Sequence, residues 1–236
     1  MELNVDFMIK TLWLVFKSVP VTLKITLVSL LAAIPFSFFM ALARIYEISL
    51  LQTLVKLYVS FIRGTPMVLQ ILVIYSLVPS FLNSAVKYLG WNIKVFDFDP
   101  IIYAYIVFGM NTTALLSEVF RSALLSIQAG QLEAGLSIGM TLAQVYRRII
   151  IPQALVAALP NVCNLTVNLI KNTSLAFLMT VKDITATGKI AASYGYNYIE
   201  AYLDIFLVYL VLCTVVQLLF KYAEDRSGTF RQLNSH

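Results

Sequence analysis

The sequence predicts an all-helical integral membrane protein with five transmembrane helices. Of its 236 residues 60% are apolar and only 12% are charged, whereas about a quarter of residues are charged in soluble domains. The mean hydropathy is +0.83. Only helices and closed barrels satisfy backbone polar groups in hydrocarbon, and the long apolar runs lack the strict alternation of barrel strands.

A transmembrane helix needs about 20 mostly apolar residues, and five stretches without Asp, Glu, Lys or Arg come close to this length. They cover residues 25–43, 64–86, 100–117, 149–170 and 205–220. The last is short, but residues 201–203 extend it. We therefore expect a membrane domain at residues 19–225, followed by a cytoplasmic tail at 226–236.

Residues 1–18 have the pattern of an amphipathic helix. Lys10, Lys17 and Lys24 recur every seven residues and share one face, while the opposite face carries Phe7, Trp13 and Phe16. Such a helix favours the membrane interface.

The lysine and arginine residues of the loops divide nine against eight between the two sides of the membrane, so charge alone does not orient the chain. If the N-terminal lysines rest on headgroups, the arginine-rich side is cytoplasmic. The N-terminus would then be outside and the C-terminus in the cytoplasm.

Composition argues against several classes of protein. Cys163 and Cys213 lie in apolar runs without metal-ligand spacing, and the single histidine is the last residue, His236. We therefore expect no metal, no cofactor and no catalytic residue in this chain. The basic residues form no block, which disfavours nucleic-acid binding.

The segment at residues 126–152, between the third and fourth predicted spans, differs from an ordinary connecting loop. Leu132, Leu136, Ile138, Leu142 and Val145 recur at helical spacing. Glycine and alanine keep another side of this helix smooth, so a second backbone could approach closely. The segment is either a docking element for a partner or a plain connecting helix.

The spacing within this segment resembles a known signature. Glu133, Ala134 and Gly135 are followed by Gly139, Ile149 and Pro152 at the intervals of the Glu-Ala-Ala signature found in permease subunits of ABC importers. Two positions depart from that signature: Gly135 replaces its second alanine, and Ile151 replaces a leucine.

Other motifs resemble the polar amino acid branch of the same family. They are Arg63-Gly64-Thr65-Pro66, Glu118 with Arg121, Gly130-Gln131, and the run from Lys171 through Thr173 to Leu175. The resemblance covers residues 22–225.

The resemblance implies a type I importer permease in a bacterial cell membrane, carrying a polar amino acid such as cystine. It implies a dimer of cytoplasmic ABC ATPases that holds ATP and Mg²⁺, a second permease subunit, identical or paralogous, and an extracytoplasmic binding protein. Glu133 would contact the ATPase, Gly139 would allow a close turn, and Pro152 would set the angle of the fourth span. The chain has no P-loop of its own.

Asn161, Asn164, Asn168 and Lys171 form a polar stripe on the predicted fourth span. With Thr173, it is a candidate lining of the substrate path, or else a set of hydrogen bonds between helices. Glu118 and Arg121 can pair along one helix face.

Arg63, Gly64 and Pro66 predict a break or reorienting turn before the second span.

Two alternatives to an importer remain at this stage. An ion-gradient-driven transporter would need carboxylates or histidines within its spans, and the five apolar runs lack them. A non-transporting scaffold or receptor is compatible with the composition.

Overall fold

The computed structural model describes residues 3–233 and contains helices but no β-strand in that range. The α-helices are α1 Val5–Lys17, α2 Val19–Ile45, α3 Ser49–Gly64, α4 Met67–Tyr88, α5 Pro100–Leu125, α6 Ala129–Ser137, α7 Leu142–Val145, α8 Ile151–Asn172, α9 Ile184–Ser193 and α10 Tyr198–Leu233. Short 3₁₀ segments η1 Val95–Asp97 and η3 Thr173–Met179, and the π-helical segment η2 Tyr146–Ile150, join them.

Five stretches of the described chain are long and apolar enough to cross a membrane: Val5–Ile45, Met67–Tyr88, Pro100–Leu125, Leu142–Met179 and Tyr198–Ser227. Each contains one of the five predicted runs. The all-helical fold class is therefore confirmed.

The first apolar stretch is longer than predicted because α1 leads into α2 with only Ser18 between them. Thr11 and Val15 of α1 are buried, and α1 packs on α9 and α10. Trp13 and Phe16 remain exposed and stack on each other. The predicted amphipathic segment is therefore the helix α1, which packs on the bundle and leads directly into α2.

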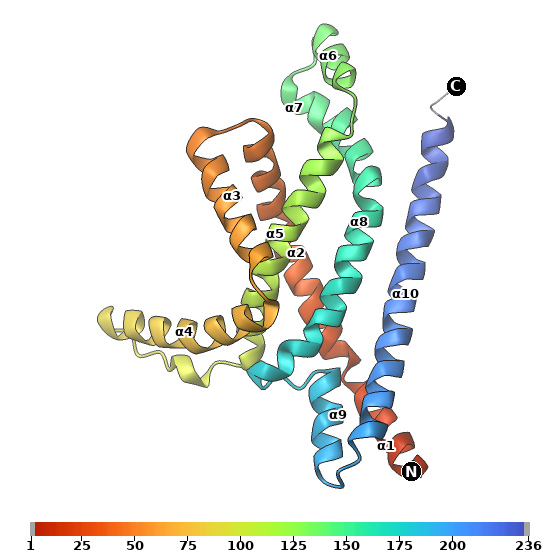
Figure 1. Cartoon of the computed structure of the whole chain (residues 1–236). Coiled ribbons are helices and arrows are strands. Elements are labelled where there is room, and N and C mark those ends of the chain that lie inside the picture. The colour runs from red at the N-terminus through yellow and green to blue at the C-terminus, as the bar shows by residue number, and fades with distance from the viewer. Residues whose placement is uncertain (1–2, 234–236) are drawn as a thin grey trace.

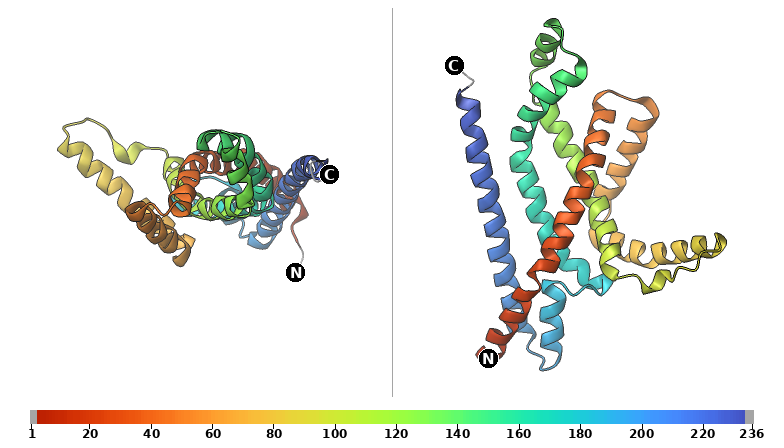
Figure 2. Two further views of the ribbon diagram at one scale, coloured as in Figure 1. Left: turned by 90° about the horizontal axis from the view of Figure 1, so that it is seen from above. Right: turned by 180° about the vertical axis from the view of Figure 1, so that it is seen from behind.

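The second predicted span is preceded by a helix that the hydropathy reading missed. α3 descends beside α2 and α5, and the chain then turns sharply into α4, which projects sideways from the bundle (Figure 1, Figure 2). Arg63 and Gly64 end α3, while Thr65 and Pro66 are extended. This motif is the reorienting turn that the sequence allowed.

A hydrogen-bond network fixes this turn. The Gln70 side-chain amide donates to the carbonyls of Ile62 (2.8 Å) and Thr65 (3.1 Å), which lie at the C-terminal end of α3. Asn111 of α5 donates to Gln70 Oε1 (3.2 Å). Because Gln70 is buried, the network joins the start of α4 to both α3 and α5.

The helices α2, α5 and α8 form the centre of the bundle. One buried cluster includes Ile25, Val107 and Phe108 towards the N-terminal end of α2, and another includes Ala41, Val145 and Ala154 towards the opposite end. The C-terminus lies at the end that carries α6 and α7, and the N-terminus lies at the other end (Figure 1). The predicted tail is continuous with α10 as far as Leu233.

Candidate coupling loop and membrane path

The segment predicted as one helix folds as two helices joined by a turn. α6 ends at Ser137, and α7 begins at Leu142. Gly139 has a φ of +85°, a conformation that glycine adopts without the steric cost met by other residues. Gly139 thus lies in a turn, and the segment whose periodicity predicted one helix is divided there into two.

Close packing of α6 on α7 explains the glycine that departs from the family signature. Gly135 is buried, and a Cβ atom added there would lie 2.7 Å from Val145 Cγ2. Val145 is fully buried in the cluster that includes Ala41 and Ala154. The loop is therefore packed onto the end of the bundle and does not hang freely.

A capping box starts α7. Thr141 Oγ1 accepts from Gln144 N (3.3 Å), while Thr141 N donates to Gln144 Oε1 (2.8 Å). These bonds satisfy backbone and side-chain groups at the helix N-terminus. They fix the chain directly after the turn at Gly139.

The loop joins α8 through a π-helical turn. Ile151 N donates to the carbonyl of Tyr146, five residues back, and Ile149 is partly buried. Pro152 stands in the first turn of α8, where its missing N–H and its ring are tolerated next to the widened π turn. Helical structure therefore continues from the loop into the membrane span.

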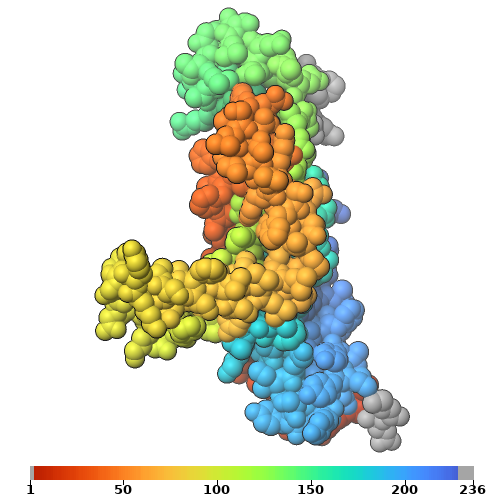
Figure 3. Space-filling view, turned by 60° about the vertical axis from the view of Figure 1, so that its left-hand side comes forward, coloured from red at the N-terminus to blue at the C-terminus, as the bar shows by residue number. Residues whose placement is uncertain are grey.

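The tip of the loop exposes an apolar surface. Ile138 is 78% exposed, and Leu136 and Leu142 are also exposed. Glu133 and Ala134 of α6 are exposed as well. The space-filling view shows this loop standing out at one end of the molecule (Figure 3).

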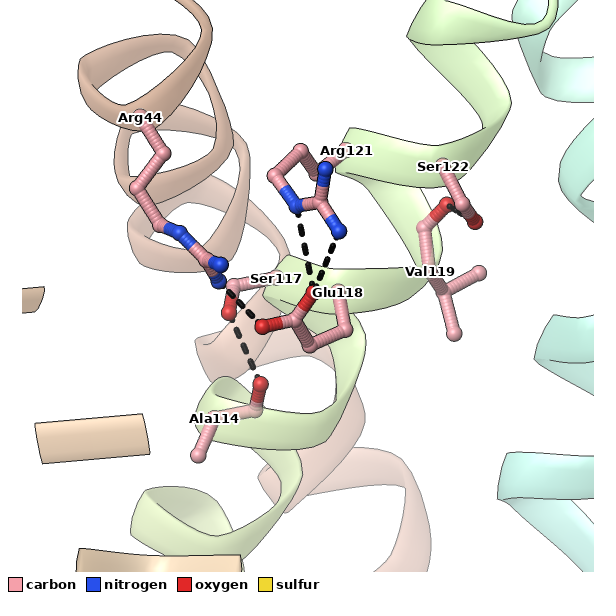
Figure 4. Close-up of polar contacts among 7 residues, drawn as sticks. All are labelled: Arg44, Ala114, Ser117, Glu118, Val119, Arg121 and Ser122. Carbon is pink, nitrogen blue, oxygen red and sulfur yellow. Dashed lines mark hydrogen bonds and ion pairs between the residues drawn. The ribbon is translucent and has the colours of Figure 1, made fainter. Parts of the chain in front are cut away.

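Glu118 pairs with two arginines near the same end of the bundle (Figure 4). The predicted Arg121 Nε donates to Glu118 Oε2 at 3.1 Å, within α5. Arg44 of α2 binds Glu118 Oε1 through Nη1. No local pattern predicts the pairing of Arg44 with Glu118, because the two residues are 74 positions apart in the chain.

The polar stripe of α8 lies on an exposed face. Asn161, Asn164, Asn168 and Lys171 are all exposed, and none of the four has a side-chain hydrogen bond within the described part of the chain. Thr173 differs from them, since it is fully buried and donates to the carbonyl of Ile170 (2.7 Å). Its geometry places it in the helix packing and not on the stripe.

The helices extend beyond the apolar runs and so bring carboxylates inside candidate spans. Glu118 lies in α5, and Asp204 lies in α10, 1% exposed and with Oδ2 lacking a hydrogen-bond partner. The apolar runs themselves contain no carboxylate, and both groups lie just beyond the ends of those runs. Within residues 3–227, however, no group of three or more His, Cys, Asp or Glu residues could hold a metal ion.

Known proteins match nearly the whole chain. The L-cystine transport system permease protein TcyL of Bacillus subtilis (strain 168) is 34% identical over 88% of this chain and 84% of its own. The probable amino-acid permease protein YxeN of the same organism is 37% identical over 91% of each chain. The octopine transport system permease protein OccM of Rhizobium radiobacter is 30% identical over 95% of this chain and 90% of its own.

Solved structures share the fold. A crystal structure of an amino acid ABC transporter with histidines has a TM-score of 0.78 and 27% identity, over 96% of this chain and 100% of its own. The MetNI methionine ABC transporter in an inward-facing conformation has a TM-score of 0.63 and 21% identity, over 91% of this chain and 94% of its own. The family model for the binding-protein-dependent transport system inner membrane component matches residues 33–228. The chain therefore belongs to this family of ABC importer permease subunits, multi-pass membrane proteins that work with an ATPase and a substrate-binding protein.

Proposed function

We propose that this chain forms the membrane path of an importer for a polar amino acid and receives the mechanical output of ATP hydrolysis through the loop at residues 126–152. The exposed apolar tip of that loop carries the proposal. Leu136, Ile138 and Leu142 are exposed, whereas Gly135 and Val145 hold the loop firmly to the bundle. A rigid element with an apolar tip fits a partner protein better than it fits water.

The partner at this tip is a dimer of cytoplasmic ABC ATPases, which supplies ATP and Mg²⁺. Glu133 is exposed on α6 and offers a charge to this partner. Helical structure runs without interruption from Leu142 to Met179. A displacement of the loop would therefore move α8 as a rigid lever.

The substrate proposal rests on α8 and on the relatives. Asn161, Asn164, Asn168 and Lys171 present amides and an ammonium group on one exposed face, where they can bind the carboxylate and amino groups of an amino acid. The relatives include permeases for L-cystine and octopine. A second permease subunit, identical or paralogous, would complete the path, and an extracytoplasmic binding protein would deliver the substrate at the end opposite the loop.

The test is ATP hydrolysis by the full transporter, reconstituted with its ATPase and binding protein. Glu133→Arg and Gly139→Trp should each abolish the stimulation of hydrolysis by loaded binding protein. Matched controls away from the loop, in the segment that follows α4, are Asp97→Arg and Gly90→Trp. Asp97 is exposed, and Gly90, like Gly139, has a positive φ with no atom near its missing Cβ.

Retention of stimulated hydrolysis in both loop variants would contradict the coupling role and favour a non-transporting scaffold. Uptake of labelled amino acids, with cystine among them, then identifies the substrate. Variants Asn164→Leu and Asn168→Leu should lower uptake, and unchanged uptake would remove the stripe from the path.

A further inference from the structure

A pocket of about 460 Å³ lies between α2, α3 and α5 and is distinct from the loop and from the polar stripe of α8. We call it the cationic pocket. It is lined by Arg44, Lys56, Val59, Ser60, Arg63, Gly64 and Glu118. In Figure 1, α2 and α5 stand between α3 and α8, so the pocket is not on the α8 side of the bundle.

Positive charge exceeds negative charge in the cationic pocket. Glu118 is its single carboxylate and is already bound by Arg44 and by Arg121. Arg63 forms no ion pair or hydrogen bond within the described residues, and Lys56 Nζ donates only to Gln52 Oε1 at 3.0 Å. Unneutralised charge near hydrocarbon is costly, and a bound anion would remove that cost.

The donors of the pocket converge in a way that suits a phosphate group. Lys56, Ser60 and Arg63 are spaced four and three residues apart and share one face of α3. Gly64 leaves open space where a side chain would stand. The Nε of Arg44 is buried without a hydrogen-bond partner, which adds an unused donor on the α2 side.

The surroundings of the pocket are apolar. Leu57, three residues before Ser60, borders this face of α3, and Leu54 and Phe61 continue the exposed apolar surface around the helix away from the donors. A soluble anion gains nothing from such a surface, whereas the acyl chains of a lipid would cover it. The pocket also includes Arg44 at the end of α2 that leads to the loop side of the molecule.

We propose that the cationic pocket binds the phosphodiester headgroup of an anionic phospholipid from the cytoplasmic leaflet, with its acyl chains against α3. The leaflet assignment rests on the proposed orientation of the loop. Basic pockets between transmembrane helices on this side suit anionic headgroups. The lipid would bridge α3 to the Arg44–Glu118–Arg121 cluster and so hold α3 beside α2 and α5.

The experiment is native mass spectrometry of the purified full chain in detergent, with phosphatidylglycerol or phosphatidylethanolamine added. The wild-type protein should retain phosphatidylglycerol in preference to phosphatidylethanolamine. Lys56→Gln with Arg63→Gln should weaken this retention about 25-fold, taking roughly fivefold for each basic group near the headgroup. The double variant Lys56→Arg with Arg63→Lys should retain the lipid, as should the control Lys87→Gln with Lys94→Gln, which removes two exposed lysines elsewhere.

Equal retention of both lipids by wild type, or an equal loss in the control, would overturn the proposal. Displacement of the lipid by inorganic phosphate would show a phosphate site and not a lipid site, and binding of a free amino acid in place of the lipid would assign the pocket to the substrate path. If the glutamine double variant is not recovered folded, Arg63→Gln alone gives the same comparison. Because no ATPase is present, the result is independent of the coupling experiment.

Discussion

Gly135 lies in α6 at a point where the loop cannot accommodate the alanine that the family signature carries. Gly135→Ala would place a methyl group 2.7 Å from Val145 Cγ2, and β-branched Val145 has little rotational freedom to move away. We expect overpacking to cost about 1–3 kcal/mol and to raise hydrogen exchange of the α6 amides.

The control is Gly130→Ala in the same helix, where no atom lies within 4 Å of the added Cβ. It should leave exchange unchanged or slow it. Val145→Ala combined with Gly135→Ala should recover much of the lost protection. Equal exchange in wild type and Gly135→Ala would show that α6 does not pack on α7 as described.

Asp183 caps α9 from a fully buried position. Its carboxylate accepts from Ala186 N (2.8 Å), Thr185 N (3.2 Å) and the Tyr209 hydroxyl (3.2 Å). Burial outweighs these hydrogen bonds and raises the pKa of Asp183 from 3.8 to about 6. Because the folded protein holds this proton more tightly than the unfolded chain, the group's contribution to stability is fully present below about pH 4 and falls until about pH 6.

The variant Asp183→Asn tests this pH dependence, since asparagine also caps helices. Relative to the variant, wild type should lose up to roughly 3 kcal/mol between pH 4 and pH 7, measured by unfolding in detergent. The control Asp99→Asn replaces an exposed aspartate that caps α5. A wild-type curve parallel to that of Asp183→Asn would contradict the raised pKa.

At the scale of secondary-structure elements, the sharp angle between α3 and α4 depends on the side chain of Gln70. Gln70→Leu would leave the carbonyls of Ile62 and Thr65 without their side-chain donor, and Asn111 without its acceptor. Unpaired buried polar groups cost about 1–3 kcal/mol, so we expect a lower melting temperature.

Gln52→Leu in α3 is the control and should change the melting temperature little, because both hydrogen bonds of its amide, to the Glu47 carbonyl (3.4 Å) and from Lys56 Nζ (3.0 Å), are exposed to solvent. Distances between spin labels on α3 and α4 should broaden in Gln70→Leu only. A single sharp distance in that variant would show that Thr65 and Pro66 alone set the angle.

The elements also show what sequence patterns can predict in this protein. Long apolar runs locate the spans, because burial in hydrocarbon acts on each segment separately. α3 escaped detection because Lys56 and Arg63 interrupt its apolar residues. The turn at Gly139 divides a pattern that has helical periodicity throughout, so periodicity alone could not reveal the break.

Contacts between distant segments were beyond the reach of local patterns. Glu118 and Arg121 were predicted as a pair, since they are three residues apart. The ion pair of Arg44 with Glu118 joins residues that are 74 positions apart in the chain. The hydrogen bond of Asn111 with Gln70 joins residues that are 41 positions apart. Thr173 shares a motif with Lys171, yet its side chain points into the packing.

At the scale of the whole molecule, the two ends of the bundle carry different structural elements. The loop of α6 and α7 lies at the same end as the C-terminus, and the N-terminus and α9 lie at the other end (Figure 2). If the loop contacts a cytoplasmic ATPase, the N-terminus must be outside. Arg147 and Arg148, both exposed in the part of the loop that leads into α8, agree with a cytoplasmic position, because arginine and lysine accumulate on that side.

Cysteine labelling in intact cells tests this orientation. In a chain with Cys163→Ser and Cys213→Ser, an impermeant maleimide should label Leu3→Cys directly, because Leu3 is exposed near the N-terminus. Ser137→Cys, exposed at the end of α6, should be labelled only after the cells are permeabilised. Labelling of both variants after permeabilisation confirms that the thiols are reactive, so the reverse order in intact cells would place the loop outside and remove the ATPase from its proposed contact.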